Sequence, residues 1–149
     1  FNRAAIRRAL IPMAAALIAG SLTAVIVAIA VAAAFGASVE TLLSLAPKSA
    51  TTPIAMGVAE RIGGAPALTA VLVILTGVIG AVCATPVLNA GGVKGPKARG
   101  FAMGVAAHGI GAARGFQESE RTGAFAGIGM GLNGLATAII APLIVAWLL

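Results

Sequence analysis

Three long runs without a charged residue constrain this chain more than any other feature of its sequence. They cover residues 9–39, 62–93 and 122–149, and each is longer than the ~20 apolar residues that a helix needs to cross ~30 Å of hydrocarbon. Only 9% of the 149 residues are charged and 60% are hydrophobic, a composition that is unusual for a water-soluble domain. The sequence therefore predicts an all-α integral membrane protein that forms a single membrane domain over residues 1–149.

Prolines and glycines set the expected limits of these transmembrane helices. Pro12 and Pro66 suit the first turn of the first and second helices, where a missing N–H costs no helical hydrogen bond. The first helix is expected to end near Phe35. The second is expected to end within residues 86–89, before a basic, glycine-rich turn over residues 91–99.

Two further stretches, residues 42–61 and 100–121, are apolar but interrupted. The longest charge-free run of the second stretch, residues 100–113, would be about 21 Å long as a helix at ~1.5 Å per residue, which is too short to span. We interpret each stretch as two half-helices that meet at a break and turn back. Broken backbone survives at membrane depth only where protein or a water-filled cavity satisfies its polar groups.

The two interrupted stretches match each other at a shift of sixty residues. Lys48 aligns with His108, and Glu60-Arg61 aligns with Glu120-Arg121, without a gap. Duplicated units that each carry a broken segment are typical of secondary transporters, whose substrate site lies near the bilayer midplane. The expected parts are a first unit at about residues 9–62, a second at about 69–122 and a final transmembrane helix at 122–149.

The basic residues decide whether the two units are parallel or inverted. The chain has 10 Lys and Arg against 4 Asp and Glu, and such an excess in a membrane protein marks cytoplasmic loops. Arg3, Arg7 and Arg8 share a side with the basic turn at residues 91–99 only if each broken stretch turns back on itself. The units are then inverted, with the first break entering from outside and the second from the cytoplasm.

The first break carries residues that suit an anion. Thr51, Thr52 and Pro53 predict the start of a helix, with Thr52 as the N-cap and Pro53 as the first helical residue. The free N–H groups and the positive dipole end of such a helix favour a carboxylate or a phosphate. Lys48 and Ser49 add a charge and a hydroxyl, although Lys48 is also compatible with snorkelling to the membrane interface.

The second break offers a different set of groups. Gly109 and Gly111 permit close backbone approach, and Arg114 carries the planar fork that matches a carboxylate. His108 titrates near neutral pH, as proton coupling would require. Two alternatives stay open: His108 as a packing residue bonded to a carbonyl, and Arg114 paired with Glu118 one turn on.

Isolated amides and glycines outside the breaks have structural interpretations. Asn89 and Asn133 are expected to bridge neighbouring helices more than to bind a ligand. Gly123, Gly127 and Gly131 follow each other at four-residue intervals. We expect these glycines to form a small-residue ridge that packs against the second broken stretch.

The composition argues against several other classes of protein. The single cysteine, Cys83, allows neither an internal disulfide nor a thiolate metal cluster. One His, no Asp and four Glu are too few for a hydrolytic site, so we predict no metal, no cofactor and no enzymatic activity. Tyr is absent and aromatics are 4%, which does not favour a nucleic-acid platform.

The residues around the two breaks resemble the hallmark segments of the LrgB/CidB family. Residues 47–56 read Pro-Lys-Ser-Ala-Thr-Thr-Pro-Ile-Ala-Met, and residues 107–114 read Ala-His-Gly-Ile-Gly-Ala-Ala-Arg. Both are matched in order and at the family's separation, and the similarity extends over essentially the whole chain. Members of this family are usually longer at the N-terminus, so the resemblance and the initial Phe1 together imply a chain that lacks its beginning.

The resemblance implies two competing functions. Bacterial members are named antiholin-like or holin-like proteins that modulate murein hydrolases and autolysis with a small partner, LrgA or CidA. The plant plastid relative is a glycolate/glycerate transporter, and bacterial relatives are associated with pyruvate or glycolate. A lesion-forming protein needs no duplicated breaks that carry cations, whereas a carrier of small carboxylates does.

We therefore favour a carrier of small monocarboxylates that works by alternating access in the cytoplasmic membrane of a bacterium, with proton coupling left open. Besides the substrate and membrane lipid, the expected partners are an LrgA/CidA-type protein and further copies of the chain. The expected substrate-binding residues are Lys48, Ser49, Thr51, Thr52, Pro53, His108, Gly109, Gly111 and Arg114.

Overall fold

The structure is a computed structural model that describes residues 3–148, and every regular element in this range is a helix. The helices are α1 (Arg3–Ala34), α2 (Val39–Leu45), α3 (Thr52–Ile62), α4 (Pro66–Ala90), α5 (Pro96–Glu118) and α6 (Glu120–Leu148). The all-α prediction is confirmed. The position of Phe1 lies outside the described residues.

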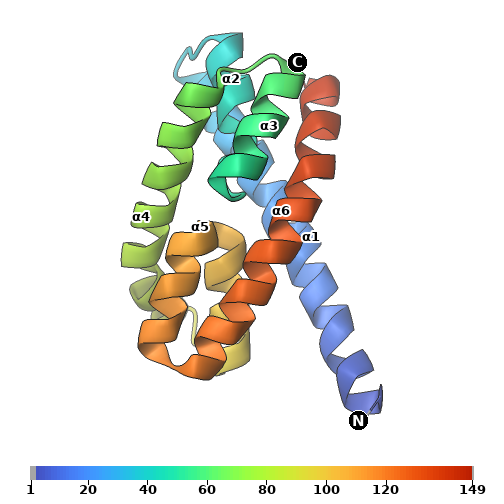
Figure 1. Cartoon of the computed structure of the whole chain (residues 1–149), viewed down its shortest axis with the longest axis vertical. Helices are drawn as coiled ribbons and strands as arrows, with labels where there is room; N and C mark the ends of the chain where they lie inside the picture. The colour runs from blue at the N-terminus through green and yellow to red at the C-terminus, as the bar shows by residue number, and fades with distance from the viewer. Residues whose placement is uncertain (1–2, 149) are drawn as a thin grey trace.

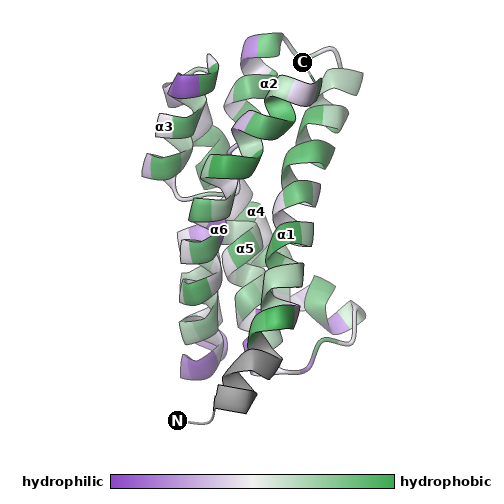
Figure 2. Cartoon of the chain, turned by 90° about the vertical axis from the view of Figure 1, so that its right-hand side faces the viewer, coloured by the Kyte–Doolittle hydropathy of each residue, from purple (hydrophilic) through white to green (hydrophobic). Residues whose placement is uncertain are grey.

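Three helices, α1, α4 and α6, contain stretches long and apolar enough to cross a membrane. These stretches are Leu10–Ala34, Pro66–Ala90 and Glu120–Leu148. The three helices run between the two ends of the molecule (Figure 1). Hydrophobic residues cover their lengths, and many of the hydrophilic residues gather near helix ends (Figure 2). The three predicted transmembrane helices are therefore confirmed.

The predicted starts of the first two long helices differ in accuracy. Pro66 begins α4, as expected. Pro12 lies inside α1, which begins at Arg3, so the prediction that Pro12 marks the first turn is wrong. Neighbouring groups in a membrane bundle can satisfy the carbonyl that an internal proline leaves free, so a proline does not define a boundary there.

Both predicted breaks are present. Residues 46–51 separate α2 from α3, and α5 is interrupted at Ala107 (φ −129°, ψ 18°) and His108 (φ 42°, ψ −131°). The two arms of α5, residues 96–106 and 109–118, lie side by side (Figure 1). The α2–α3 hairpin lies near the end where α1 finishes and the α5 hairpin near the opposite end, where α4 finishes (Figures 1 and 2). Each broken stretch thus turns back on itself.

Helices α5 and α6 pack with their backbones in close contact. A Cβ atom on Gly104 would collide with the carbonyl of Ala126, and one on Gly129 would approach the Phe101 carbonyl oxygen to 2.6 Å. A side chain at either position would therefore separate the two helices. Glycine lets the backbones meet without this obstacle, as is typical of helix contacts in membranes.

The predicted ridge of α6 glycines is only partly correct. Gly123 packs under the ring of Phe116, but no described atom lies within 4 Å of a Cβ built on Gly127 or Gly131. Each four-residue step advances about 40° around a helix of 3.6 residues per turn. Gly127 and Gly131 therefore turn progressively away from α5, and Gly129 makes the close approach in their place.

We predict that Gly104→Ala destabilises the protein, because the added methyl group would overlap the α6 backbone, and overpacking typically costs ~1–3 kcal/mol. The matched control is Gly127→Ala, whose methyl group meets open space. Thermal unfolding in detergent should show a lower Tm for Gly104→Ala and no loss for Gly127→Ala. Equal Tm values for the two variants would contradict the packing argument.

Candidate anion-binding site

Lys48 lies in the first break, just after α2 ends. The backbone turns here through hydrogen bonds from the N–H of Lys48 to the carbonyl of Leu45 (3.1 Å) and from the N–H of Ala50 to the carbonyl of Pro47 (3.0 Å). The Lys48 ammonium donates to the hydroxyl oxygen of Ser49 at 3.2 Å. This bond leaves two of the three ammonium N–H groups available to another acceptor.

The start of α3 corrects one prediction. The N-cap is Thr51, with an extended backbone (φ −66°, ψ 147°), and Thr52 is already the first helical residue, so Thr52 does not cap the helix. Pro53 takes the second helical position, where its missing N–H also costs no bond because the first four N–H groups of a helix have no helical partner. Within the described part of the chain, no side-chain bond from Thr51 closes this end.

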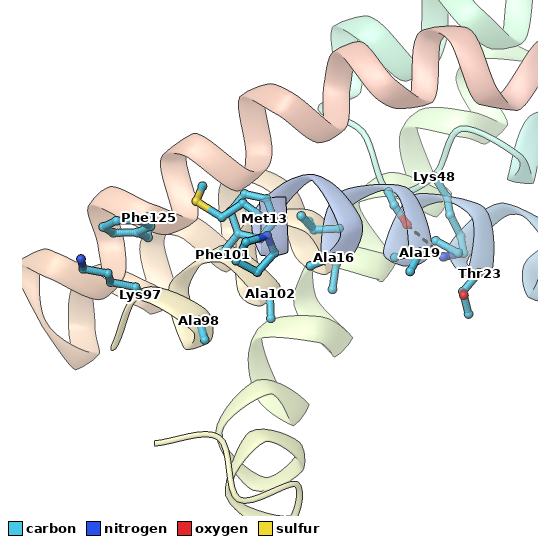
Figure 3. A pocket seen from close by; sticks show the side chains of 16 residues that line it. Met13, Ala16, Ala19, Thr23, Lys48, Lys97, Ala98, Phe101, Ala102 and Phe125 are labelled. Atoms are coloured by element: carbon cyan, nitrogen blue, oxygen red, sulfur yellow. Dashed lines mark hydrogen bonds between the residues drawn. The ribbon is translucent and has the colours of Figure 1, made fainter. Parts of the chain in front are cut away.

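A cavity of about 750 Å³ lies between α1 and the first arm of α5. Lys48 and Ser49 lie at one end of it, and Lys97 and Phe125 at the other (Figure 3). Its lining is mostly apolar, with Phe101 among the larger side chains. The Lys97 ammonium lies 5.6 Å from the centre of the Phe125 ring, a cation–π arrangement. The cavity thus joins a cation at the chain's basic end to a cation in the first break.

A second cavity, of about 450 Å³, begins where the first one ends. Lys48, Thr23 and Ala24 line both cavities. The first cavity reaches along α1 to Pro12 and the second reaches to Ala32. These two α1 residues are separated by about 30 Å at ~1.5 Å per residue, comparable to the thickness of the hydrocarbon core. Lys48 therefore lies near the middle of the stretch of α1, residues 12–32, that lines the two cavities.

A buried amide, that of Asn133, is hydrogen-bonded to the backbone of the first break. The Asn133 Nδ2 donates to the backbone carbonyl of Ser49 (2.8 Å), and the Ser21 hydroxyl donates to the Asn133 Oδ1 (2.7 Å). Asn133 and Ser21 are each 1% exposed. The prediction that Asn133 bridges neighbouring helices is confirmed, since it joins α6 to α1 and to the break.

His108 turns towards α4. Its Nε2 lies 2.8 Å from the carbonyl oxygen of Val73, and because a carbonyl can only accept, Nε2 carries the hydrogen. The ring is buried and lies against Gly77, where a Cβ would come within 2.6 Å of it. His108 is not among the described residues that line the two cavities. Of the two interpretations of His108, the structure contains the carbonyl-bonded arrangement.

Arg114 lies at the end of α4 and not beside Lys48. Its Nη2 donates to the hydroxyl of Thr85 (2.9 Å) and its Nη1 to the Oε1 of Gln117 (3.1 Å). Thr85 in turn donates to the Oε1 of Glu118 (2.7 Å). Arg114 therefore reaches Glu118 through Thr85, and the direct pairing considered from the sequence is replaced by this bridge.

A bidentate ion pair joins the two arms of α5 at the end opposite the break. The Nη2 and Nε of Arg99 lie 2.7 and 2.8 Å from the two carboxylate oxygens of Glu118. These hydrogen bonds, together with the one from Thr85, hold the pKa of Glu118 at about 2, well below its ordinary value, against the opposing effect of burial. This pair was not predicted from the sequence, although its signal is present there: Arg99 and Glu118 are opposite charges that flank the second predicted break.

The glycines of the second break have different surroundings. Gly111 packs against the backbone of Met103 in the opposite arm, so its small size serves the hairpin itself. Gly109 is exposed, and a Cβ there would have the Met130 sulfur as a neighbour at 3.8 Å. The structure thus brings Lys48 and Ser49 together at the cavities and places His108 and Arg114 on the α4 side.

Both broken segments lie within the part of the chain that matches a known protein family. The model of the LrgB-like family matches residues 1–147. The chain belongs to the LrgB-like family. No solved structure matches it.

Two curated relatives of this LrgB-family chain are proteins of Bacillus. The "Uncharacterized protein YwbG" of Bacillus subtilis (strain 168) is 41% identical over 105 residues, which are 70% of this chain and 47% of that protein. The "Antiholin-like protein LrgB" of Bacillus cereus (strain B4264) is 38% identical over 128 residues, 86% of this chain and 56% of the relative. The chain spans about half the length of these relatives.

We predict that Glu118 makes the stability of this LrgB-family chain depend on pH in the acidic range. The pKa of Glu118 in the folded protein is about 2, below the ~4.3 of an unfolded chain. Ionised Glu118 therefore stabilises the fold fully above about pH 4.5, and this contribution is lost as the pH falls towards 2. Thermal unfolding should show a lower Tm for Glu118→Gln than for wild type near neutral pH, and most of that difference should be lost as the pH falls to about 2.

The control for this experiment is Glu60→Gln. Glu60 is exposed on α3 and makes no ion pair within the described part of the chain. Its removal should leave the pH profile of the wild type unchanged. A constant Tm difference between wild type and Glu118→Gln across the whole pH range would refute the assignment.

Proposed function

We propose that this LrgB-family membrane protein carries small monocarboxylates across the bilayer by alternating access, with Lys48 and Ser49 as its central anion-binding groups. The observation that carries the proposal is the position of Lys48 at the junction of two cavities that lead in opposite directions along α1. A single cation shared by two such cavities is what a carrier needs, because its substrate must reach one site from either side.

The chemistry of the larger cavity supports a substrate with one carboxylate. Lys48 is the only charged group that lines its inner end in the described chain, and the walls towards Met13 and Phe101 are apolar. A second carboxylate on the substrate would be left in this apolar space without a partner, which is strongly unfavourable. Glycolate, glycerate, lactate and pyruvate each combine one carboxylate with a small uncharged body.

The proposal extends to the remaining predicted binding residues. Thr51, Thr52 and Pro53 place the N-terminus of α3 close behind Lys48, where free N–H groups favour an anion. His108 and Arg114, with Gly109 and Gly111, belong to the second break, which would act when the protein opens towards the other side. In this proposal the two breaks belong to inverted units at about residues 9–62 and 69–122.

The distribution of charge supports an orientation in the membrane. Lys94, Lys97, Arg99 and Arg121 lie around the α5 end of the molecule, together with the start of α1, whose side chains lie outside the description. Excess cations mark the cytoplasmic side. We therefore place this end in the cytoplasm and the protein in the cytoplasmic membrane of a bacterium. Further copies of the chain and an LrgA/CidA-type protein are proposed partners, and no catalytic step is required.

A second candidate function is regulation of murein hydrolases and autolysis. Its support is the name of the Bacillus cereus relative, "Antiholin-like protein LrgB". The two functions differ in a measurable way, because a carrier saturates and selects its substrate whereas a protein that forms lesions also releases unrelated solutes.

We predict that Lys48→Met abolishes saturable uptake of labelled glycolate, lactate or pyruvate in proteoliposomes, while Lys48→Arg retains part of it. The substitution by Met keeps an unbranched side chain and removes the charge. The matched control is Lys94→Met, which changes an exposed cation that lines neither cavity along α1. Uptake that does not saturate, together with leakage of an encapsulated dye, would exclude the carrier and favour the antiholin-like function.

We also predict that Arg114→Lys loses most uptake while the protein remains in the membrane. An ammonium cannot reproduce the two-pronged contact of a guanidinium with a carboxylate. The comparison variant is Gln117→Ala, which removes the neighbour of Arg114 on its own helix and should transport normally. Wild-type uptake by Arg114→Lys would show that Arg114 does not bind the substrate and that its role is structural, through its bond to Thr85.

A further inference from the structure

The carbonyl of Ser49 has an unusual position for a backbone acceptor. Ser49 lies in the first break, after the end of α2 and before the first helical hydrogen bond of α3, which runs from Ala55 N–H to the Thr51 carbonyl. No regular helical partner is therefore placed to serve the Ser49 carbonyl. At membrane depth such a group must find its partner within the protein.

Asn133 provides that partner from the middle of α6. Its Nδ2 donates to the Ser49 carbonyl at 2.8 Å, although the two residues are 84 positions apart in the chain. Its Oδ1 is held in turn by the Ser21 hydroxyl of α1. The nitrogen and the oxygen of this amide each have a partner, on different elements, and the two bonds together fix its orientation.

The second break has a corresponding contact. Adding sixty to Lys48 gives His108, and adding sixty to Val73 gives Asn133. The bond between His108 and Val73 and the bond between Ser49 and Asn133 thus join positions that correspond, within one residue, at the sixty-residue shift. Val73 lies in α4, inside the second proposed unit, and Asn133 lies in α6, the final helix, so each break is tied by one buried hydrogen bond to a corresponding position of a long helix.

The two contacts differ in whether they occupy the side chain of the break residue or only its backbone. At the second break the titratable side chain itself makes the bond, so the His108 ring is held against α4. At the first break the bond comes from α6 to the backbone, so Lys48 can face the cavities. The orientation of the peptide next to Lys48 therefore depends on the amide of Asn133.

We propose that Asn133 is the positioning residue of the anion site: by holding the Ser49 carbonyl, it sets the direction of Lys48 and the Ser49 hydroxyl and thereby the affinity for a carboxylate. This inference rests on the proposed function of Lys48. Asn133 does not touch the substrate and acts only through the break. Its loss should change binding more than the turnover of a saturated carrier.

The test is uptake of labelled glycolate by proteoliposomes that contain Asn133→Leu, which has similar volume and no hydrogen-bonding group. We expect the half-saturation concentration to rise about tenfold, as loss of one buried hydrogen bond allows, while the maximal rate per folded protein changes less than about twofold. The matched control is Thr122→Val, another buried polar residue of α6, which bonds to Ser119 and should leave the half-saturation concentration unchanged.

A second variant covers the case in which Asn133→Leu does not fold, as judged by gel filtration in detergent. Ser21→Ala removes only the bond that orients the amide and should raise the half-saturation concentration about twofold to threefold. A reduced maximal rate with an unchanged half-saturation concentration in the folded variant would show that Asn133 is structural only. Absence of saturable uptake in the wild type would instead overturn the proposed function itself.

Discussion

Backbone that leaves a helix inside a membrane must find its hydrogen-bond partners in the protein, and this constraint governs the whole structure. The first break meets it through the amide of Asn133, which donates to the Ser49 carbonyl. The second break is tied to α4 by the bond from His108 to the Val73 carbonyl. The two partners lie on long helices, 84 and 35 residues away in the chain, so both bonds depend on how those helices pack. The first break, which carries Lys48 and Ser49, therefore depends on contacts with α6 as well as on its own sequence.

The remaining contacts keep the hairpins in place for these bonds. Gly104 and Gly129 allow the backbones of α5 and α6 to meet, and the pair between Arg99 and Glu118 joins the two arms of α5 at their open end. The ion pair lies at the basic end of the molecule, whereas the glycine contacts extend along the helices. Close glycine contacts therefore hold α5 to α6 along the helices, and the ion pair holds the two arms of α5 together at the basic end.

The two cavities lie beside α1, and the first arm of α5 lines the larger one. Lys48 projects into this space from the first break, and α1 lines it from Pro12 to Ala32 with mostly small side chains. Lys48 thus lies where the two cavities meet, and the first break holds it there.

The sequence by itself determined the three spanning helices, the two breaks and the presence of Lys48 in the first one, because the length of an apolar run and the residues that interrupt it are local properties of the chain. It did not determine the helix cap, which is Thr51 and not Thr52. Only the tertiary structure decided which side chains share a cavity: it turned His108 and Arg114 towards α4 and brought Asn133 to the first break. The rotation of each helix about its axis decides such meetings, and that rotation is set by packing between segments that lie far apart in the chain.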